Sequence, residues 1–267
     1  GAVEATFRHI LDVIPTLDEL GHKRVLKQLC HMKDGLVLIT GVTGSGKSST
    51  LAAMVNLISQ HKKGVIITVE DPIEYVFTHG KSAVKQREVG ADTHTFSAAL
   101  KYALRQDPDV IMVSELRDME TIQAAITAAE TGHLVLGTLH TIDAPRSLDR
   151  LIDVFPAAQQ SQIIAQLANC LRAVVSQRLI KVGKSNERVL AEEVMIVNHP
   201  IRNCIRERKF EQIDGLIEIG GKDGMFTIDH HLCELIRKKK ITVEEAYTAS
   251  RDKTIIDNFL KNRRTNI

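Results

Sequence analysis

The stretch Gly41-Val42-Thr43-Gly44-Ser45-Gly46-Lys47-Ser48 decides the fold, because it fits the pattern G-x-x-x-x-G-K-[ST] at every fixed position. It follows an apolar run at 36–40 and opens an amphipathic stretch at 48–60, the strand–loop–helix setting that the motif requires. Glycines allow successive backbone N–H groups to curl around phosphate oxygens, and the helix N-terminus adds a favourable dipole. We therefore predict that this loop, together with Ser49, binds ATP. Lys47 should reach the β- and γ-phosphates, and the Ser48 hydroxyl should ligate Mg²⁺.

The first half of the chain alternates apolar runs with amphipathic stretches. Continuous apolar runs suit strands that are buried on both faces of a sheet, and the alternation predicts a mostly parallel sheet flanked by helices. The predicted strands are 36–40, 65–69, 110–113 and 134–139, and the predicted helices are 48–60, 96–106 and 119–131. In such sheets ligands bind beyond the carboxyl ends of the strands. The polar residues that close the four runs should therefore meet at one edge; they lie near Gly41, Glu70, Glu115 and His140.

The pattern changes near residue 156. Apolar residues at helical spacing predict one long helix at 159–178. A hairpin of 179–182 and 189–197 should follow, around the turn Gly183-Lys184-Ser185-Asn186. From Ile201 onward we expect short charged helices, broken at Gly215, at Gly220-Gly221 and at Gly224. The predicted division is a core at 17–198 and a helical C-terminal subdomain at 199–267.

Composition excludes several classes of protein. The 267 residues are 43% hydrophobic and 25% charged, an ordinary globular balance, and the formal net charge of +2 does not indicate a nucleic-acid partner. The four cysteines are scattered without a C-x-x-C pair, which argues against a disulfide framework or a four-thiolate zinc site. No apolar run approaches the roughly 20 residues of a membrane helix. We expect a soluble cytoplasmic protein.

Acidic residues follow two of the predicted strands. The run 109–115 resembles a Walker B strand in which Ser114 takes the first acidic position, so Glu115 must either hold Mg²⁺ or activate the attacking water. Past the second strand, Pro72 fixes a turn that carries Glu70 and Glu74. Hydrolysis of ATP needs a group that orients or deprotonates water, and either glutamate suits that task. The chemistry alone does not choose between them.

Two histidines, His133 and His140, bracket the fourth strand. Such a pair suits sensing of the γ-phosphate or relay of its presence to a neighbour, although a lone histidine is more often a surface or core residue. Zinc is disfavoured, because neither cysteine nor acid lies at ligand spacing beside them.

The order of these motifs resembles that of the secretion ATPases of type II and type IV pilus systems. The Walker A loop is followed by D-P-I-E at 71–74, by L-R-Q-D-P-D-V at 104–110 with its terminal glutamate, and by G-H-L and G-T-L-H at 132–140. Within that superfamily the chain is similar to the pilus-retraction motors. The stretches that carry this narrower similarity are 128–133, 152–156 and 201–207. The C-x-x-C zinc module usual in the extension ATPases does not occur.

The resemblance implies a RecA-like core in a homohexameric cytoplasmic ring. The ring would hydrolyse ATP to drive pilus retraction and twitching motility, bound to an inner-membrane platform protein and touching the membrane only through partners. By the same resemblance Glu74 is the general base, Glu115 the Walker B acid, and His133 and His140 the two histidines of the His box. The family's N-terminal PAS-like domain is expected to be absent, with residues 1–16 as the remaining linker, so that hydrolysis by this chain should be slow.

Some residues depart from the family pattern. Ser114 stands where the family usually has Gly, and Pro200 and Cys204 alter the retraction segment. The alternatives are an accessory pilus or type II secretion ATPase, a pilus protein that binds ATP without turnover, and a RecA-like nucleic-acid translocase. The translocase is disfavoured, because only 4% of the residues are aromatic and few bases could be stacked.

Overall fold

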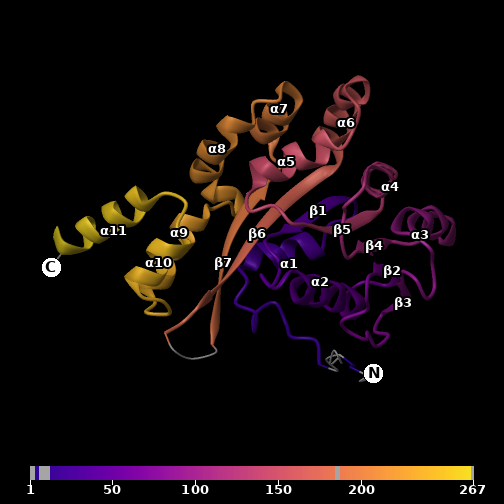
Figure 1. The fold of residues 1–267 in the computed structure, drawn as a ribbon, viewed down its shortest axis with the longest axis horizontal. Helices are drawn as coiled ribbons and strands as arrows, with labels where there is room; N and C mark the ends of the chain where they lie inside the picture. The colour runs from indigo at the N-terminus through magenta and orange to yellow at the C-terminus, as the bar shows by residue number, and fades with distance from the viewer. Residues whose placement is uncertain (1–3, 6–12, 184–186, 266–267) are drawn as a thin grey trace.

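The computed structural model describes residues 4–5, 13–183 and 187–265. A seven-stranded sheet in the order β3-β2-β4-β5-β1-β6-β7 lies between two layers of helices (Figure 1). All neighbouring strands pair in parallel except β6 and β7, which form an antiparallel hairpin. The strands are β1 (Gly35–Thr40), β2 (Gly64–Glu70), β3 (Ser82–Glu88), β4 (Val110–Val113), β5 (Leu134–Leu139), β6 (Leu171–Lys181) and β7 (Arg188–Ile196). The predicted α/β fold with a mostly parallel sheet is confirmed.

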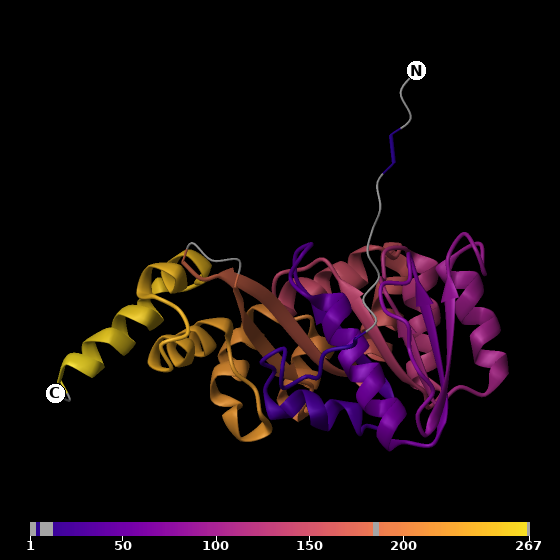
Figure 2. The ribbon, with the colours of Figure 1, turned by 90° about the horizontal axis from the view of Figure 1, so that it is seen from below.

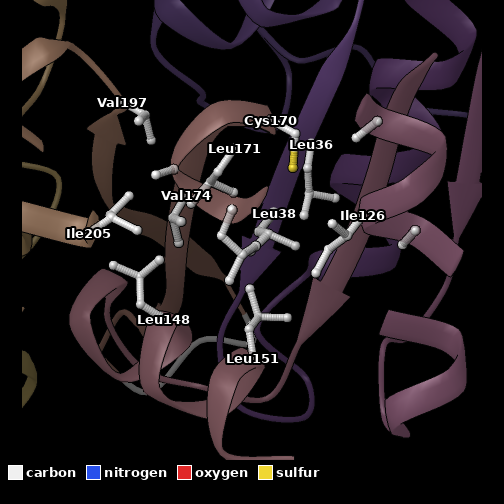
Figure 3. Packing of buried hydrophobic residues seen from close by; sticks show 14 of the residues in the cluster. Leu36, Leu38, Ile126, Leu148, Leu151, Cys170, Leu171, Val174, Val197 and Ile205 are labelled. Carbon is white, nitrogen blue, oxygen red and sulfur yellow. The ribbon is translucent and has the colours of Figure 1, made fainter. Parts of the chain in front are cut away.

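The two faces of the sheet bury separate cores. Alternation along β1 sends Val37 and Ile39 toward one face, where α1 (Arg24–Cys30) and α2 (Lys47–His61) pack. Leu36 and Leu38 point to the other face (Figure 3). The helices that cover this second face are α3 (Phe96–Ala103), α4 (Met119–Glu130), α5 (Ala144–Asp153), α6 (Ala157–Cys170), α7 (His199–Glu207) and α8 (Ile213–Ile219).

The C-terminal helices pack at the far end of the β6–β7 hairpin. Ile180 of β6 and Ala191 of β7 share a third apolar cluster with these helices. Both views place them at one end of the molecule (Figures 1 and 2). They are α9 (Ile228–Arg237), α10 (Val243–Ala249) and α11 (Lys253–Thr265).

The elements of the first half agree with the predictions. All four expected strands and all three expected helices are present, with the stretch 96–106 divided into α3 and a 3₁₀ turn at Leu104–Gln106. The sequence analysis missed β3, an edge strand whose burial alternates at Ser82–Lys85 and whose residues are mostly polar. An edge strand buries less surface than a central one, so it lacks the apolar run that marked the others.

The long helix expected at 159–178 was wrong in its second half. Helix α6 ends at Cys170, and Leu171 begins the long strand β6 in extended conformation. Residues 173–177 are buried within the sheet, between β1 and the edge strand β7. A strand buried on both faces has apolar residues at every spacing, including helical spacing, so periodicity could not separate the two. The hairpin is confirmed, but its first strand begins at Leu171 rather than Leu179, and Lys184–Asn186 of the expected turn lie outside the described residues.

The expected division at 198/199 does not coincide with a boundary between cores. Ile201 and Ile205 of α7 and Ile213 of α8 belong to the main core, so only α9–α11 form a separate cluster. The break expected at Gly215 was wrong, because Gly215 lies inside α8. Most of the expected linker at 1–16 lies outside the described residues. Among the described helices, none combines the length and the apolar character needed to cross a bilayer.

Candidate nucleotide-binding site

The glycine-rich loop connects the end of β1 to the start of α2, which begins at Lys47. Gly41, Gly44 and Gly46 have positive φ values of 146°, 78° and 90°. Side chains rarely tolerate this region, and a Cβ on Gly41 would also lie 2.5 Å from the Gln177 carbonyl oxygen. The conformation of the loop therefore depends on its glycines. It directs the N-terminus of α2, with its unpaired N–H groups, toward the carboxyl edge of the sheet.

Lys47 holds the loop closed with its side chain. Its ammonium donates to the Gly41 carbonyl at 2.8 Å and to the Val42 carbonyl at 3.1 Å. Burial lowers the pKa of Lys47, while the nearby carboxylates of Glu115 and Glu74 oppose that shift. A partly desolvated ammonium within a curl of N–H groups suits the binding of a di- or triphosphate.

A cavity of about 630 Å³ lies beside the loop at the carboxyl edge of the sheet. It brings together nine of the predicted site residues: Thr43, Gly44, Gly46, Lys47, Ser48, Ser49, Glu74, Glu115 and His140. Of the other loop residues, Val42 and Ser45 line a second hollow and Gly41 is buried. The expected convergence of four strand ends is therefore observed.

Glu115 lies at the centre of a small ionic network. Its Oε1 is 2.6 Å from Arg117 Nε and 3.2 Å from His140 Nε2. Burial raises the pKa of Glu115, but the hydrogen bonds and positive charges of Arg117 and His140 lower it by more, so the net shift is downward. Thr43 Oγ1 lies 3.5 Å from His140 Nδ1, so the histidine stands between the acid and the loop. The carboxylate is thus held ionised near the phosphate-binding loop.

The two candidate bases, Glu70 and Glu74, lie in different surroundings in the acidic turn after β2. Glu70 is buried, and its Oε1 accepts hydrogen bonds from Thr68 Oγ1 at 2.6 Å and Gln86 Nε2 at 3.0 Å. Burial raises the pKa of Glu70 despite these bonds. The chain then passes the cis Asp71–Pro72 peptide, and Glu74 lines the cavity near enough for its charge to act on Lys47. Glu70 also lines the cavity, so both candidate bases remain at the site and differ in burial and in their bonds within the fold.

His133 is not brought to this cavity. It precedes β5, at the end of the strand opposite to His140. Its Nδ1 lies 3.0 Å from the Ala128 carbonyl oxygen and 3.2 Å from Thr131 Oγ1. A strand of six residues separates the two histidines, so one chain cannot direct both at one phosphate.

Several lining residues were missed by the sequence analysis. Tyr75 follows Glu74, and its hydroxyl lies 2.8 Å from Ser49 Oγ. Arg117 stands two residues after Glu115, a spacing that places it at the same strand end, but without a motif to mark it. Leu179 and Arg188 reach the cavity from the β6–β7 hairpin, which lies too far along the chain for local patterns to connect it to the loop.

The residues present fit the expected Mg²⁺. The exposed Ser48 hydroxyl and the Glu115 carboxylate supply oxygen ligands, which this hard cation prefers. In the described part of the chain no three His, Cys, Asp or Glu side chains gather into a metal site.

Comparison with known proteins agrees with this geometry. The chain is 47% identical over 242 residues to a twitching motility protein of Neisseria gonorrhoeae, and 50% identical over 243 residues to the type IV pilus retractation ATPase PilT of Pseudomonas aeruginosa. These alignments cover 91% of this chain and 65% and 70% of the two relatives, so the chain spans about two thirds of their length.

A solved structure of the pilus retraction motor PilT with bound ADP superimposes with a TM-score of 0.85 at 48% identity. The match covers 92% of this chain and 70% of that one, and the core has the RecA-like fold. The family described as "Type II/IV secretion system protein" matches residues 14–265. The chain belongs to the type II/IV secretion system protein family.

Proposed function

We propose that the protein is an ATPase motor that powers type IV pilus retraction and twitching motility. The observation that carries the proposal is the cavity in which the glycine-rich loop meets Glu74 and Glu115, in a chain about half identical to retraction ATPases. The loop would hold the phosphates, and carboxylates on the facing strand ends would act on water or metal. ATP is the substrate in this proposal, with Mg²⁺ as its cation.

Each cavity residue has a role that its setting supports. Lys47 would neutralise the β- and γ-phosphates, and Ser48 with Glu115 would hold Mg²⁺. Glu74 would orient or deprotonate the attacking water, because its carboxylate faces the cavity. His140, which lies between Glu115 and Thr43, would respond to the γ-phosphate. His133 lies outside the cavity and would relay that state to a neighbouring subunit.

The resemblance to pilus motor ATPases supports a proposal for the assembly. We propose a homohexameric ring at the cytoplasmic face of the inner membrane, bound to a pilus platform protein and attached to the membrane only through partners. No nucleic acid is expected, because the net charge is only +2 and aromatic residues for base stacking are few. The family model also includes type II secretion proteins, so an accessory pilus or secretion ATPase is the second candidate.

Turnover and size together test the proposal. Purified protein should bind ADP and should release phosphate from ATP without stimulation by DNA. Size exclusion followed by light scattering should give the mass of a ring. The variant Glu115→Gln should retain ADP binding and lose about a hundredfold or more of the turnover. Parental turnover in Glu115→Gln would remove Glu115 from the mechanism. ADP binding without any turnover in rings would favour a non-enzymatic pilus protein, and stimulation by DNA would favour a translocase.

A further inference from the structure

A buried polar cluster lies behind the phosphate-binding loop and outside the cavity. We define it as His22, Thr50, Gln177 and Glu192, which come from the segment before α1, from α2, from β6 and from β7. His22 Nδ1 is 2.7 Å from Glu192 Oε2, and both side chains are fully buried. His22 Nε2 and Gln177 Nε2 each lie 2.8 Å from Thr50 Oγ1. Three segments therefore meet at the Thr50 hydroxyl, and β7 joins the cluster through His22.

Thr50 Oγ1 has three polar partners. The hydroxyl donates to the Gly46 carbonyl oxygen at 3.1 Å and accepts from the Gln177 amide at 2.8 Å. His22 Nε2 lies 2.8 Å from the same oxygen. The other ring nitrogen of His22 shares a proton with the Glu192 carboxylate, whose Oε1 accepts from the Lys23 backbone N–H at 3.0 Å. Among the described residues Gln177 Oε1 has no hydrogen-bond partner, but the other bonds of the cluster favour one geometry, because each lost bond leaves a further unpaired polar group.

The cluster contacts the phosphate-binding loop at both of its ends. At the end of the loop, the Thr50 hydroxyl holds the carbonyl of Gly46, the residue before Lys47. At the start, the Gln177 carbonyl oxygen lies so close to Gly41 that a Cβ there would approach it to 2.5 Å. The backbone of Gln177 therefore lies against Gly41, and its side chain is hydrogen-bonded to Thr50 in the first turn of α2. None of the four cluster residues lines the cavity.

We propose that Thr50 and Gln177, braced by the His22–Glu192 pair, are positioning residues for the phosphate-binding loop. They fix the direction of the backbone N–H groups at the start of α2, and hence the affinity for the phosphates of the nucleotide. Hydrogen bonds weaken steeply as their angle departs from linearity, so a small tilt of this turn affects several N–H groups together. The inference rests on the proposed binding of nucleotide by this site.

The test separates positioning from simple structural support. Thr50→Val keeps the shape of the side chain and removes the hydroxyl, whereas Thr50→Ser keeps the hydroxyl and removes the methyl group. Ser59→Ala is the matched control, because Ser59 is a buried residue of the same helix whose hydroxyl bonds the Asn56 carbonyl at 2.9 Å, far from the loop. Each variant is measured for ADP affinity by calorimetry with Mg²⁺ and for melting temperature.

We expect Thr50→Val to weaken ADP binding about tenfold. Thr50→Ser should remain within about threefold of the parent and Ser59→Ala should match it, although Ser59→Ala also loses a buried bond. Gln177→Met, which leaves Thr50 in place, should weaken binding as well, and the double variant should lose less than the sum of the two effects. Gln177→Met also keeps the test open if Thr50→Val fails to fold.

Parental ADP affinity in folded Thr50→Val or Gln177→Met, with only a lower melting temperature, would overturn the positioning role. Equal loss in Thr50→Ser and Thr50→Val would overturn it too, because the hydroxyl would then be irrelevant. Absence of ADP binding in the parent protein would instead contradict the proposed function.

Discussion

Charged side chains occupy two contrasting settings in this protein. At the cavity, Lys47 donates to two backbone carbonyls of its own loop, and the Glu115 side chain is 18% exposed. Inside the fold, the neighbouring β7 residues Glu192 and Glu193 are 0% and 1% exposed, and each is bonded to a basic side chain, His22 and Arg251 respectively. Glu192 points to the α2 face toward His22, and Glu193 points to the opposite face. Lys47 and Glu115 line a cavity that a ligand can enter, whereas the bonds of Glu192 and Glu193 lie within the fold and away from that cavity.

The two β7 carboxylates also differ from each other. Glu193 accepts from the Ala144 backbone N–H at 3.2 Å and pairs with Arg251 at 2.9 Å. Arg251 is shared with Asp214 at 2.7 Å, and Asp143 lies near it. Burial raises the pKa of Glu193 to about 7, although the charge of Arg251 opposes the shift. One cation thus serves several acids, and this side of β7 should be sensitive to pH.

The largest expected effect is on the cavity side of the comparison. Lys47→Ala should reduce ATP turnover by about a thousandfold, because it removes the only ammonium that the loop encloses among the described residues. Its melting temperature should change little, since no buried carboxylate depends on Lys47 for a direct bond that the structure records. Lys27→Ala, which breaks only an exposed pair with Asp18, is the control and should leave turnover unchanged. A steady-state phosphate-release assay gives the turnover of each variant, and a thermal melt gives its melting temperature. Retained turnover in Lys47→Ala would contradict the assignment of the site.

Arg251→Met should lower the stability of the fold and leave nucleotide binding intact, the opposite of Lys47→Ala. It leaves Glu193 buried without its cation, so the free energy of unfolding should fall by about 3 kcal/mol at pH 8. ADP affinity of the folded protein should persist, because Arg251 does not line the cavity. Urea unfolding gives the stability, with the exposed Arg150→Met as control. Unchanged stability in Arg251→Met would show that the cluster on this side of β7 does not support the fold.

The pH dependence of stability should identify Glu193. Its folded pKa of about 7 lies above the ordinary value of 4.5, so the folded state binds the proton more tightly than the unfolded state. The resulting stability is fully present below pH 4.5 and is lost as pH rises through 7, by roughly 3 kcal/mol in total. Glu193→Gln should remove this decline, while the exposed Glu218→Gln should retain it. Urea unfolding between pH 5 and 8 makes the comparison, and equal slopes in all three proteins would contradict the prediction.

The sequence predicted the cavity better than the interior for a physical reason. Parallel strands end at one edge, so the convergence of residues near Gly41, Glu70, Glu115 and His140 followed from the order of apolar runs alone. The His22–Glu192 pair joins residues 170 positions apart, and no periodicity marks a polar residue that tertiary contacts will bury. The same limit explains β6, where burial on both faces removed the alternation that would have identified a strand.

A substitution at Glu70 should have the smallest effect on ATP turnover. It tests whether this residue acts like the charged residues of the cavity or like those of the interior. It lines the cavity, yet it is 5% exposed and bonded to Thr68 and Gln86 like an interior residue. Glu70→Gln keeps the shape and one accepting oxygen, so it should lower ATP turnover by less than about fivefold, the cost of about one hydrogen bond. Glu74→Gln, which changes a carboxylate that faces the cavity, is the matched comparison and should lose about a hundredfold or more. Phosphate release and ADP affinity are measured for both. If Glu70→Gln lost turnover and Glu74→Gln retained it, the buried, hydrogen-bonded carboxylate of Glu70 would be the base. Burial would then not distinguish the carboxylates that act in hydrolysis from those that stabilise the fold.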